Sequence, residues 1–479
     1  MKEYALFIKR MGLVSLANLF VNLSAVILLP IITKNLSIQD YGIWVQVNIT
    51  ILLVPYIASL GLSNSMIRFL AVLKEKNEIR EGFYSIMVLT IISTFIISLF
   101  FYLFSNYLAI LFNGNIQIAK IIPFIIFITT LNFIIINFFR TVQKMKIYSF
   151  FLLVQAYINV ILVYYFVIAG YGIYGAVLGI LITQIIVFIL MYSSILSSIG
   201  IKIPRFKNLK KYLLFGVPLI PSSLSSWIVD SSDRYIIGLL LGTTFVGYYS
   251  PGYILGNIIT IFSVPFTIIL FPTLSKKYDE NQKKETKFIL NYSLKYFLLI
   301  AIPSFFGLSI LSKPILLLLS TPEIATNGNI VTPFIALSAI FFGIYAIVSQ
   351  IILIKEKTKI IAYSWFLVAA LNIILNLIVI LYWGFIGAAV VTLISYFIIF
   401  VITWVYSRKY FKLDLNIIFI IKCTFASALM SLLILKFYPV GILEVLLFIV
   451  IFAVGYILIL LVSRAIKKQE LMFFKNILK

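Results

Sequence analysis

The sequence predicts an all-α polytopic membrane protein with about 14 transmembrane helices. Of its 479 residues, 63% are hydrophobic and only 11% are charged, and the mean hydropathy is +1.14. A bilayer core about 30 Å thick requires roughly 20 apolar residues per helix, and apolar runs of about this length fill the chain. Basic residues concentrate on alternate connections between the runs, which is typical of membrane proteins.

Each predicted span is a continuous apolar run bounded by charged or turn-forming residues. The first part of the chain contains the spans 11–33, 42–64, 83–105, 120–139, 148–168 and 174–195. The remaining spans are 212–240, 246–272, 290–312, 330–352, 360–382, 385–406, 416–437 and 441–463. We expect an N-terminal lobe over 1–200, a C-terminal lobe over 201–410, and two additional helices with a cytoplasmic tail over 411–479.

The net charge of +23 comes from 38 Lys and Arg against 15 Asp and Glu. The termini and the connections after even-numbered spans hold 31 of the basic residues, and the opposite side holds four. The richer side is therefore predicted to be cytoplasmic, with both termini on that side of the plasma (inner) membrane. Topology accounts for the charge, so no nucleic-acid partner is expected. The cluster Lys207, Lys210 and Lys211 is interpreted first as a topology signal, with contact to anionic lipid headgroups as the alternative.

Two pairs of segments resemble each other along the chain. The stretch 144–179 resembles 357–393, and each contains a turn with two glycines between two helices. The stretch 36–44 resembles 241–249. Both correspondences shift the chain by six spans, so the two six-helix lobes are predicted to be related by a pseudo-twofold axis along the membrane normal.

The seventh predicted span carries three charges. Asp230, Asp233 and Arg234 are spaced so that they share one helical face. One interpretation is an ion pair that holds this helix to a neighbour. The other is a binding site in which the guanidinium contacts an anionic or sugar group and the carboxylates accept hydroxyl hydrogen bonds. In the same span, Pro218 and Pro221 predict a bent or broken helix.

Two further arginines and three amide pairs are candidate cavity residues. Arg68 and Arg140 lie near the cytoplasmic ends of their spans, where they either extend to the interface or capture phosphate at the inner mouth of a cavity. Amides recur at i and i+4 in three spans. The pairs are Asn18 and Asn22, Gln155 and Asn159, and Asn372 and Asn376. Hydrogen bonding between helices and lining of a cavity for a hydroxyl-rich ligand are the two interpretations.

Several residue types needed for catalysis are missing. The chain has no histidine and one cysteine, Cys423, which is expected to be a small buried hydrophobe. A catalytic imidazole and a thiolate metal site are therefore excluded, and no phosphate-binding glycine loop is present. No metal, no cofactor and no enzymatic activity are expected.

The chain resembles the polysaccharide-biosynthesis flippases of the multidrug/oligosaccharidyl-lipid/polysaccharide exporter superfamily. The segments that carry the resemblance are 215–221, 230–238, 36–42 and 61–69. It implies twelve core helices in two lobes around a central cavity, often with two extra helices. It also implies outward movement of polyprenyl-diphosphate-linked oligosaccharide by alternating access, with membrane lipids and glycan-assembly enzymes as candidate partners.

Alternatives remain open at this stage. One is a cation-coupled drug or metabolite exporter of the same superfamily, although that branch typically has an acidic residue in its first helix, where this chain has Asn18 and Asn22. The lipid II flippase branch usually carries arginine in the first span, and this span has none. A membrane-embedded polysaccharide polymerase or ligase, and a scaffold for glycosyltransferases, are further alternatives.

Overall fold

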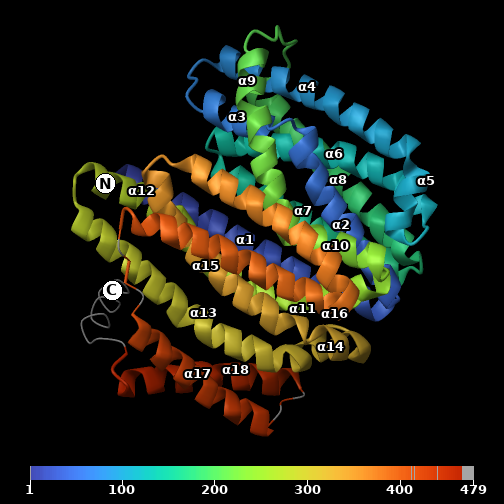
Figure 1. Cartoon of the computed structure of the whole chain (residues 1–479). Coiled ribbons are helices and arrows are strands. Elements are labelled where there is room, and N and C mark those ends of the chain that lie inside the picture. The colour runs from blue at the N-terminus through green and yellow to red at the C-terminus, as the bar shows by residue number, and fades with distance from the viewer. Residues whose placement is uncertain (1, 412, 415, 438, 440, 466–479) are drawn as a thin grey trace. The chain divides into compact units, whose positions relative to one another are not determined.

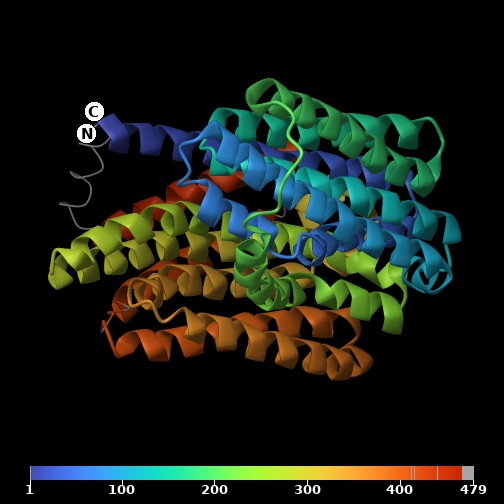
Figure 2. The same ribbon diagram turned by 90° about the horizontal axis from the view of Figure 1, so that it is seen from above.

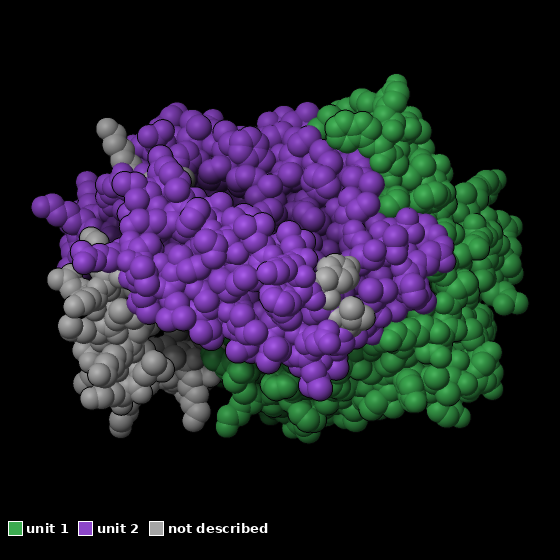
Figure 3. Space-filling model, turned by 90° about the horizontal axis from the view of Figure 1, so that it is seen from below, with its two compact units in different colours: residues 1–247, 373–385 green, residues 248–372, 386–479 purple. Residues whose placement is uncertain are grey.

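Every regular element in the described part of the computed structural model is helical (Figure 1), which confirms the predicted fold class. The structure describes residues 2–411, 413–414, 416–437, 439 and 441–465, and it describes their side chains except those at 2–11, 268, 269, 272, 276 and 279. The predicted cytoplasmic tail, from residue 466 onward, lies outside this part. The chain divides into unit 1, residues 1–247 with 373–385, and unit 2, residues 248–372 with 386–479 (Figure 3). The lobes predicted over 1–200 and 201–410 stay a prediction.

Unit 1 contains the described helices α1 to α10 and the two short 3₁₀ helices η1 and η2. Their bounds are α1 (Lys2–Asn35), α2 (Ile38–Ala58), α3 (Leu62–Leu70), α4 (Lys76–Leu103), α5 (Ser105–Leu108), η1 (Ala109–Phe112), α6 (Ile116–Thr141), α7 (Met145–Ile168), α8 (Gly172–Ile199), α9 (Leu209–Gly216), η2 (Val217–Leu219) and α10 (Ile220–Leu240). In this unit α6 packs against α2, α4 and α8, and α7 packs against α1 and α8. A core of buried aromatic and aliphatic side chains, including Phe83, Phe138 and Phe139, fills the space between α3, α4, α6 and α8.

Unit 2 is built around α13. The remaining helices of the chain are α11 (Thr243–Asn257), η3 (Ile258–Ser263), α12 (Val264–Asp279), α13 (Lys283–Leu319), α14 (Pro322–Gly328), α15 (Val331–Ile354), α16 (Thr358–Arg408), α17 (Ile417–Phe437) and α18 (Ile442–Val462). Helix α13 packs against α12, α15, α17 and α18. Phe297 of α13 lies fully buried in their shared core, as does Cys423 of α17, which is the small buried residue expected from the sequence.

Twelve helices in the described part are long and apolar enough to span a membrane, so the chain is a multi-pass membrane protein. Two features explain the difference from the fourteen predicted spans. Helix α16 has 51 residues, about 77 Å at 1.5 Å per residue, which is more than two bilayer cores. At Gly384 its φ of 60° and ψ of −153° interrupt the helical backbone between the predicted spans 360–382 and 385–406. The predicted span 246–272 is divided among α11, η3 and α12, each shorter than 18 residues.

The second and seventh spans are both interrupted, and the interruptions meet. The break in the seventh span was predicted from its prolines and lies at η2, between α9 and α10. The second span was predicted to be continuous over 42–64, which is wrong: Leu60 and Gly61 have positive φ values of 51° and 66°, and α3 begins as a separate helix after them. A Cβ atom at Gly61 would lie 2.1 Å from the Gly216 carbonyl oxygen, so only glycine permits this backbone contact between α3 and α9.

The connection over 200–208, between α8 and α9, is held against the start of α4 (Figure 2). The Tyr84 hydroxyl donates a hydrogen bond of 2.8 Å to the Gly200 carbonyl. Lys202 Nζ donates to the Asn77 carbonyl at 2.9 Å and lies 3.6 Å from a Glu81 carboxylate oxygen. The second carboxylate oxygen of Glu81 accepts a hydrogen bond from the Arg205 backbone N–H. This connection is therefore an ordered part of unit 1.

Candidate functional site

The charged face of α10 is largely buried. Asp233 Oδ1 and Arg234 Nη1 form an ion pair of 3.0 Å, and their side chains are 0% and 8% exposed. The same Asp233 oxygen accepts a hydrogen bond of 2.8 Å from the Arg234 backbone N–H. The Arg234 guanidinium also donates to the Asp230 carbonyl, whereas the Asp230 side chain is exposed. The structure thus brings the Asp233 and Arg234 side chains together and leaves the Asp230 side chain exposed.

Helix α2 supplies a polar partner surface for α10. The Thr50 and Tyr235 hydroxyls share a hydrogen bond across the two helices. Gln46 is fully buried and lies against Gly238, where a Cβ atom would come within 1.8 Å of Gln46 Nε2. The Asp233 and Arg234 ion pair forms within α10, between consecutive residues, so this pair does not itself join α10 to another helix, and both interpretations of these charges stay predictions. The sequence prediction considered pairs of amides and therefore missed Gln46 and Thr50, although this amide and this hydroxyl also stand at i and i+4.

A cluster of four amides lies where α6, α7 and α8 meet in unit 1; we call Asn132, Gln155, Asn159 and Gln184 the amide cluster. Asn132 Nδ2 donates to Gln184 Oε1 at 2.8 Å and to the Gln184 carbonyl at 2.9 Å. Gln155 Nε2 lies 3.4 Å from the same Gln184 Oε1. The Oδ1 atoms of Asn132 and Asn159 are buried without a hydrogen-bond partner among the described residues. These two oxygens are acceptors for a donor such as a hydroxyl group or water.

The first amide pair lies on the helix that packs against α7. Asn18 is half-buried and Asn22 is exposed. Between them, the Phe20 carbonyl accepts a hydrogen bond of 3.3 Å from the Tyr157 hydroxyl, and Tyr157 lies between Gln155 and Asn159 on α7. The predicted amide pairs of the first and fifth spans are therefore at the same level of the α1–α7 contact. The sequence missed Asn132 and Gln184, for which no amide recurs at i and i+4.

The remaining candidates lie elsewhere. In α16, Asn372 and Asn376 are fully buried, and Asn372 Nδ2 donates to Ser395 Oγ at 3.0 Å, across the interruption at Gly384. Hydrogen bonding between helices, the first interpretation of such pairs, describes this contact. Arg68 and Arg140 are exposed in the last turns of α3 and α6, as expected for cations at helix ends near an interface.

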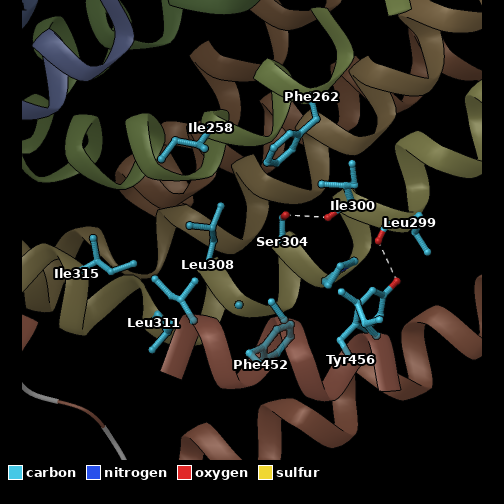
Figure 4. A pocket seen from close by; sticks show the side chains of 15 residues that line it. Ile258, Phe262, Leu299, Ile300, Ser304, Leu308, Leu311, Ile315, Phe452 and Tyr456 are labelled. Atoms are coloured by element: carbon cyan, nitrogen blue, oxygen red, sulfur yellow. Dashed lines mark hydrogen bonds between the residues drawn. The ribbon is translucent and has the colours of Figure 1, made fainter. Parts of the chain in front are cut away.

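Unit 2 contains an apolar pocket of about 420 Å³ between α13, η3 and α18 (Figure 4). Its lining is almost entirely hydrocarbon, with Phe262, Leu308 and Phe452 among the contributing side chains. Its two hydroxyls are already bonded: Ser304 donates to the Ile300 carbonyl at 2.7 Å, and Tyr456 donates to the Leu299 carbonyl at 2.9 Å. The pocket therefore offers contacts to a hydrocarbon chain and few to a polar ligand. The sequence did not predict it, because its walls come from helices far apart in the chain.

The described residues contain no group of three or more His, Cys, Asp or Glu side chains arranged to hold a metal ion. What unit 1 offers instead is a set of uncharged hydrogen-bonding groups inside a membrane-spanning bundle. Such groups bind hydroxyl-rich or amide-bearing ligands by exchange of hydrogen bonds.

Comparison with known proteins gives a family match and similar sequences. A family model described as polysaccharide biosynthesis protein matches residues 31–324, more than half of the chain. The chain is 26% identical over 234 residues to the probable low-salt glycan biosynthesis flippase Agl15 of Haloferax volcanii, covering 49% of each protein. It is 27% identical over 172 residues to the probable flippase AglR of the same organism, covering 36% of this chain and 35% of AglR. The matched region thus spans about half or less of these curated relatives.

Solved structures share the fold over most of the chain. The lipid II flippase MurJ, in an inward closed conformation, has a TM-score of 0.73 and 19% identity, covering 98% of this chain and 100% of that chain. An inward-facing multidrug resistance MATE family transporter of the MOP superfamily has a TM-score of 0.65 and 15% identity, covering 81% and 93%. At these identities the likeness demonstrates the fold, which is that of the exporter superfamily expected from the sequence.

Proposed function

The chain belongs to the polysaccharide biosynthesis protein family, and we propose that it is a flippase for polyprenyl-diphosphate-linked oligosaccharide. It moves the headgroup from the cytoplasmic to the outer leaflet for assembly of a surface glycan, by alternating access and without enzymatic chemistry. Two relatives that carry the word flippase in their names support this assignment. The glycan-assembly enzymes that make and use the lipid-linked sugar are its proposed functional partners.

The observation that carries the proposal is the amide cluster of unit 1. A sugar headgroup that crosses hydrocarbon unaided loses its hydrogen bonds to water, at a cost of several kcal/mol per unpaired group. Amide side chains donate and accept, so they replace these hydrogen bonds without adding a net charge. In this proposal the Oδ1 atoms of Asn132 and Asn159 accept hydrogen bonds from the sugar hydroxyls. Asn18 and Asn22 add two further amides along α1.

The lipid part of the substrate needs a different environment. We assign the apolar pocket of unit 2 to a segment of the polyprenyl chain, because its walls are hydrocarbon and its hydroxyls are already bonded. An inside-negative membrane potential favours outward movement of the diphosphate by about 2.3 kcal/mol per charge per 100 mV. Transport by this route requires no ATP hydrolysis by the chain.

The test is transport by the purified protein in liposomes that contain a lipid-linked oligosaccharide. Transfer between leaflets is followed by lectin access to the sugar. We expect transfer to require the protein and to fall in Gln184→Leu, which removes the centre of the amide cluster. Asn137→Leu on α6 is the matched control, because the Asn137 amide donates only within its own helix, to the Phe133 carbonyl at 2.8 Å. Wild-type liposomes that transfer no faster than protein-free ones would refute the proposal.

A further inference from the structure

A basic pocket lies at the start of the seventh span, on the face predicted to be cytoplasmic. Six residues line this cavity of about 550 Å³: Lys207, Asn208, Lys210, Lys211, Leu214 and Phe215. Three of them are exposed lysines, and one supplies an amide. The pocket combines this cationic side with an apolar side, since Leu214 is 68% and Phe215 37% exposed. Cationic and apolar walls together fit an amphiphile with an anionic headgroup.

The pocket rests on a rigid support. The Phe69 ring of α3 packs against Phe215 at a centroid distance of 5.2 Å, and Lys211 Nζ lies 4.5 Å from the centre of the same ring. One turn earlier in α3, Ser65 Oγ donates a hydrogen bond of 2.6 Å to the Tyr212 carbonyl of α9. The backbone contact of Gly61 with Gly216 completes the junction. The lysines therefore project from a helix whose position is fixed.

The lysines of this pocket differ in their partners from Lys277 and Lys287, two basic residues on the same predicted face. Lys277 lies 2.7 Å from a Glu285 carboxylate, which raises the pKa of the lysine, and Lys287 lies 3.1 Å from Asp414. Within the described residues, no carboxylate lies within 4.0 Å of an ammonium of the basic pocket. The nearby acid Glu81 is engaged by Lys202 and the Arg205 N–H. The pocket therefore keeps an excess positive charge of about three.

We propose that the basic pocket is the entry site at which the diphosphate of the polyprenyl carrier first binds, before its headgroup moves into the bundle. This inference rests on the proposed function and identifies where the substrate is recognised. The diphosphate that joins the lipid to its sugar is esterified at both ends and carries two negative charges, so three ammonium groups match it better than an ordinary phospholipid headgroup with one. The exposed leucine and phenylalanine take the first isoprene units, and Asn208 donates to a phosphate oxygen.

The test compares binding of three lipids to the full chain in nanodiscs. The probes are a C55 polyprenyl diphosphate, the corresponding monophosphate and phosphatidylglycerol, and native mass spectrometry or thermophoresis gives the affinities. The variant is Lys207→Gln/Lys210→Gln/Lys211→Gln. The control is Lys283→Gln/Lys284→Gln/Lys359→Gln, which removes the same charge from exposed lysines elsewhere. A third protein with arginine at the three pocket positions keeps the charge and reports on folding.

We expect the pocket variant to bind the diphosphate on the order of 100-fold more weakly, since each of the three lysines contributes about fivefold at a membrane surface. The affinity of the pocket variant for the monophosphate should fall less, and its affinity for phosphatidylglycerol should change little. The control and arginine proteins should bind all three lipids as the wild type does. Equal loss of diphosphate and phosphatidylglycerol would assign the pocket to general anionic lipid and overturn the inference. Wild-type affinity in the pocket variant would also overturn it. Absence of diphosphate binding by wild type would instead contradict the proposed function itself.

Discussion

The backbone contact between α3 and α9 predicts a specific order of stability among three glycine variants. Gly61→Ala combines two penalties. A left-handed φ of 66° costs an L-residue roughly 1–2 kcal/mol, and its Cβ would lie 2.1 Å from the Gly216 carbonyl oxygen. Overpacking a well-filled contact adds roughly 1–3 kcal/mol. We therefore expect Gly61→Ala to lower the free energy of unfolding by about 2–5 kcal/mol.

Two matched variants separate these penalties. Gly114→Ala has a comparable φ of 80° but no atom within 4 Å of the new Cβ, so it reports the backbone cost alone, about 1–2 kcal/mol. Gly216 has an ordinary φ of −75°, and its Cβ would lie 2.8 Å from the Leu60 and Gly61 carbonyl oxygens, so Gly216→Ala reports the contact alone, about 1–3 kcal/mol.

The assay is the thermal midpoint of each purified protein in one detergent, read from the monomer peak in size-exclusion chromatography after heating. Gly61→Ala should have the lowest midpoint of the three. If it is no less stable than Gly114→Ala, the contact between the two helix breaks contributes nothing and the packing argument fails. The Gly61→Ala protein should also bind the polyprenyl diphosphate more weakly, because the same junction supports the basic pocket.

Three other predictions test the rest of the structure. Asp233→Asn should destabilise the protein by about 3–5 kcal/mol, because it removes the carboxylate charge that pairs with the Arg234 guanidinium in a buried position. Adding Arg234→Gln should recover part of the loss in a thermal assay, and strictly additive effects would rule out coupling of the pair. At Gly307, which lines the apolar pocket, an added Cβ meets no atom within 4 Å, so Gly307→Phe places its ring at the pocket and should slow transfer of lipid-linked oligosaccharide, with Gly307→Ala as the control that should transfer as wild type. Unchanged transfer in a Gly307→Phe protein that elutes as a monomer would remove the pocket from the mechanism. In Gln117→Cys, the exposed new cysteine should react with an impermeant maleimide on intact cells, whereas in Lys357→Cys it should react only after permeabilisation. The native Cys423 is buried and should not contribute to labelling. The reverse pattern would invert the predicted topology.

The apolar runs predicted the helices well, because the length of such a run depends only on consecutive residues in the sequence. Even the interruptions follow partly from local chemistry: Pro218 and Pro221 anticipated the break at η2, and the glycine turn before the twelfth predicted span corresponds to Gly384. The break after α2 was missed, since Leu60 adopts a left-handed conformation that leucine rarely takes. Its position beside the Gly216 backbone becomes visible only in the structure.

The candidate site was predicted less completely, because it depends on which helix faces meet. Spacing placed Asp230 with Asp233 and Arg234, but the structure buries the last two against α2 and exposes the first. Gln155 and Asn159 were found because they form a pair, whereas their partner Gln184 is an isolated amide in an apolar helix. The contribution of a lone polar residue becomes visible only when the facing helices are known.

The fastening of residues 200–205 to α4 limits where movement can begin. Because Tyr84, Lys202 and Glu81 hold it, this connection is an ordered link between α8 and α9 within unit 1. If the seventh helix rotates during transport, we expect the 3₁₀ turn over Val217–Leu219 to take up the movement, with α10 changing direction while α9 keeps its contacts to α3.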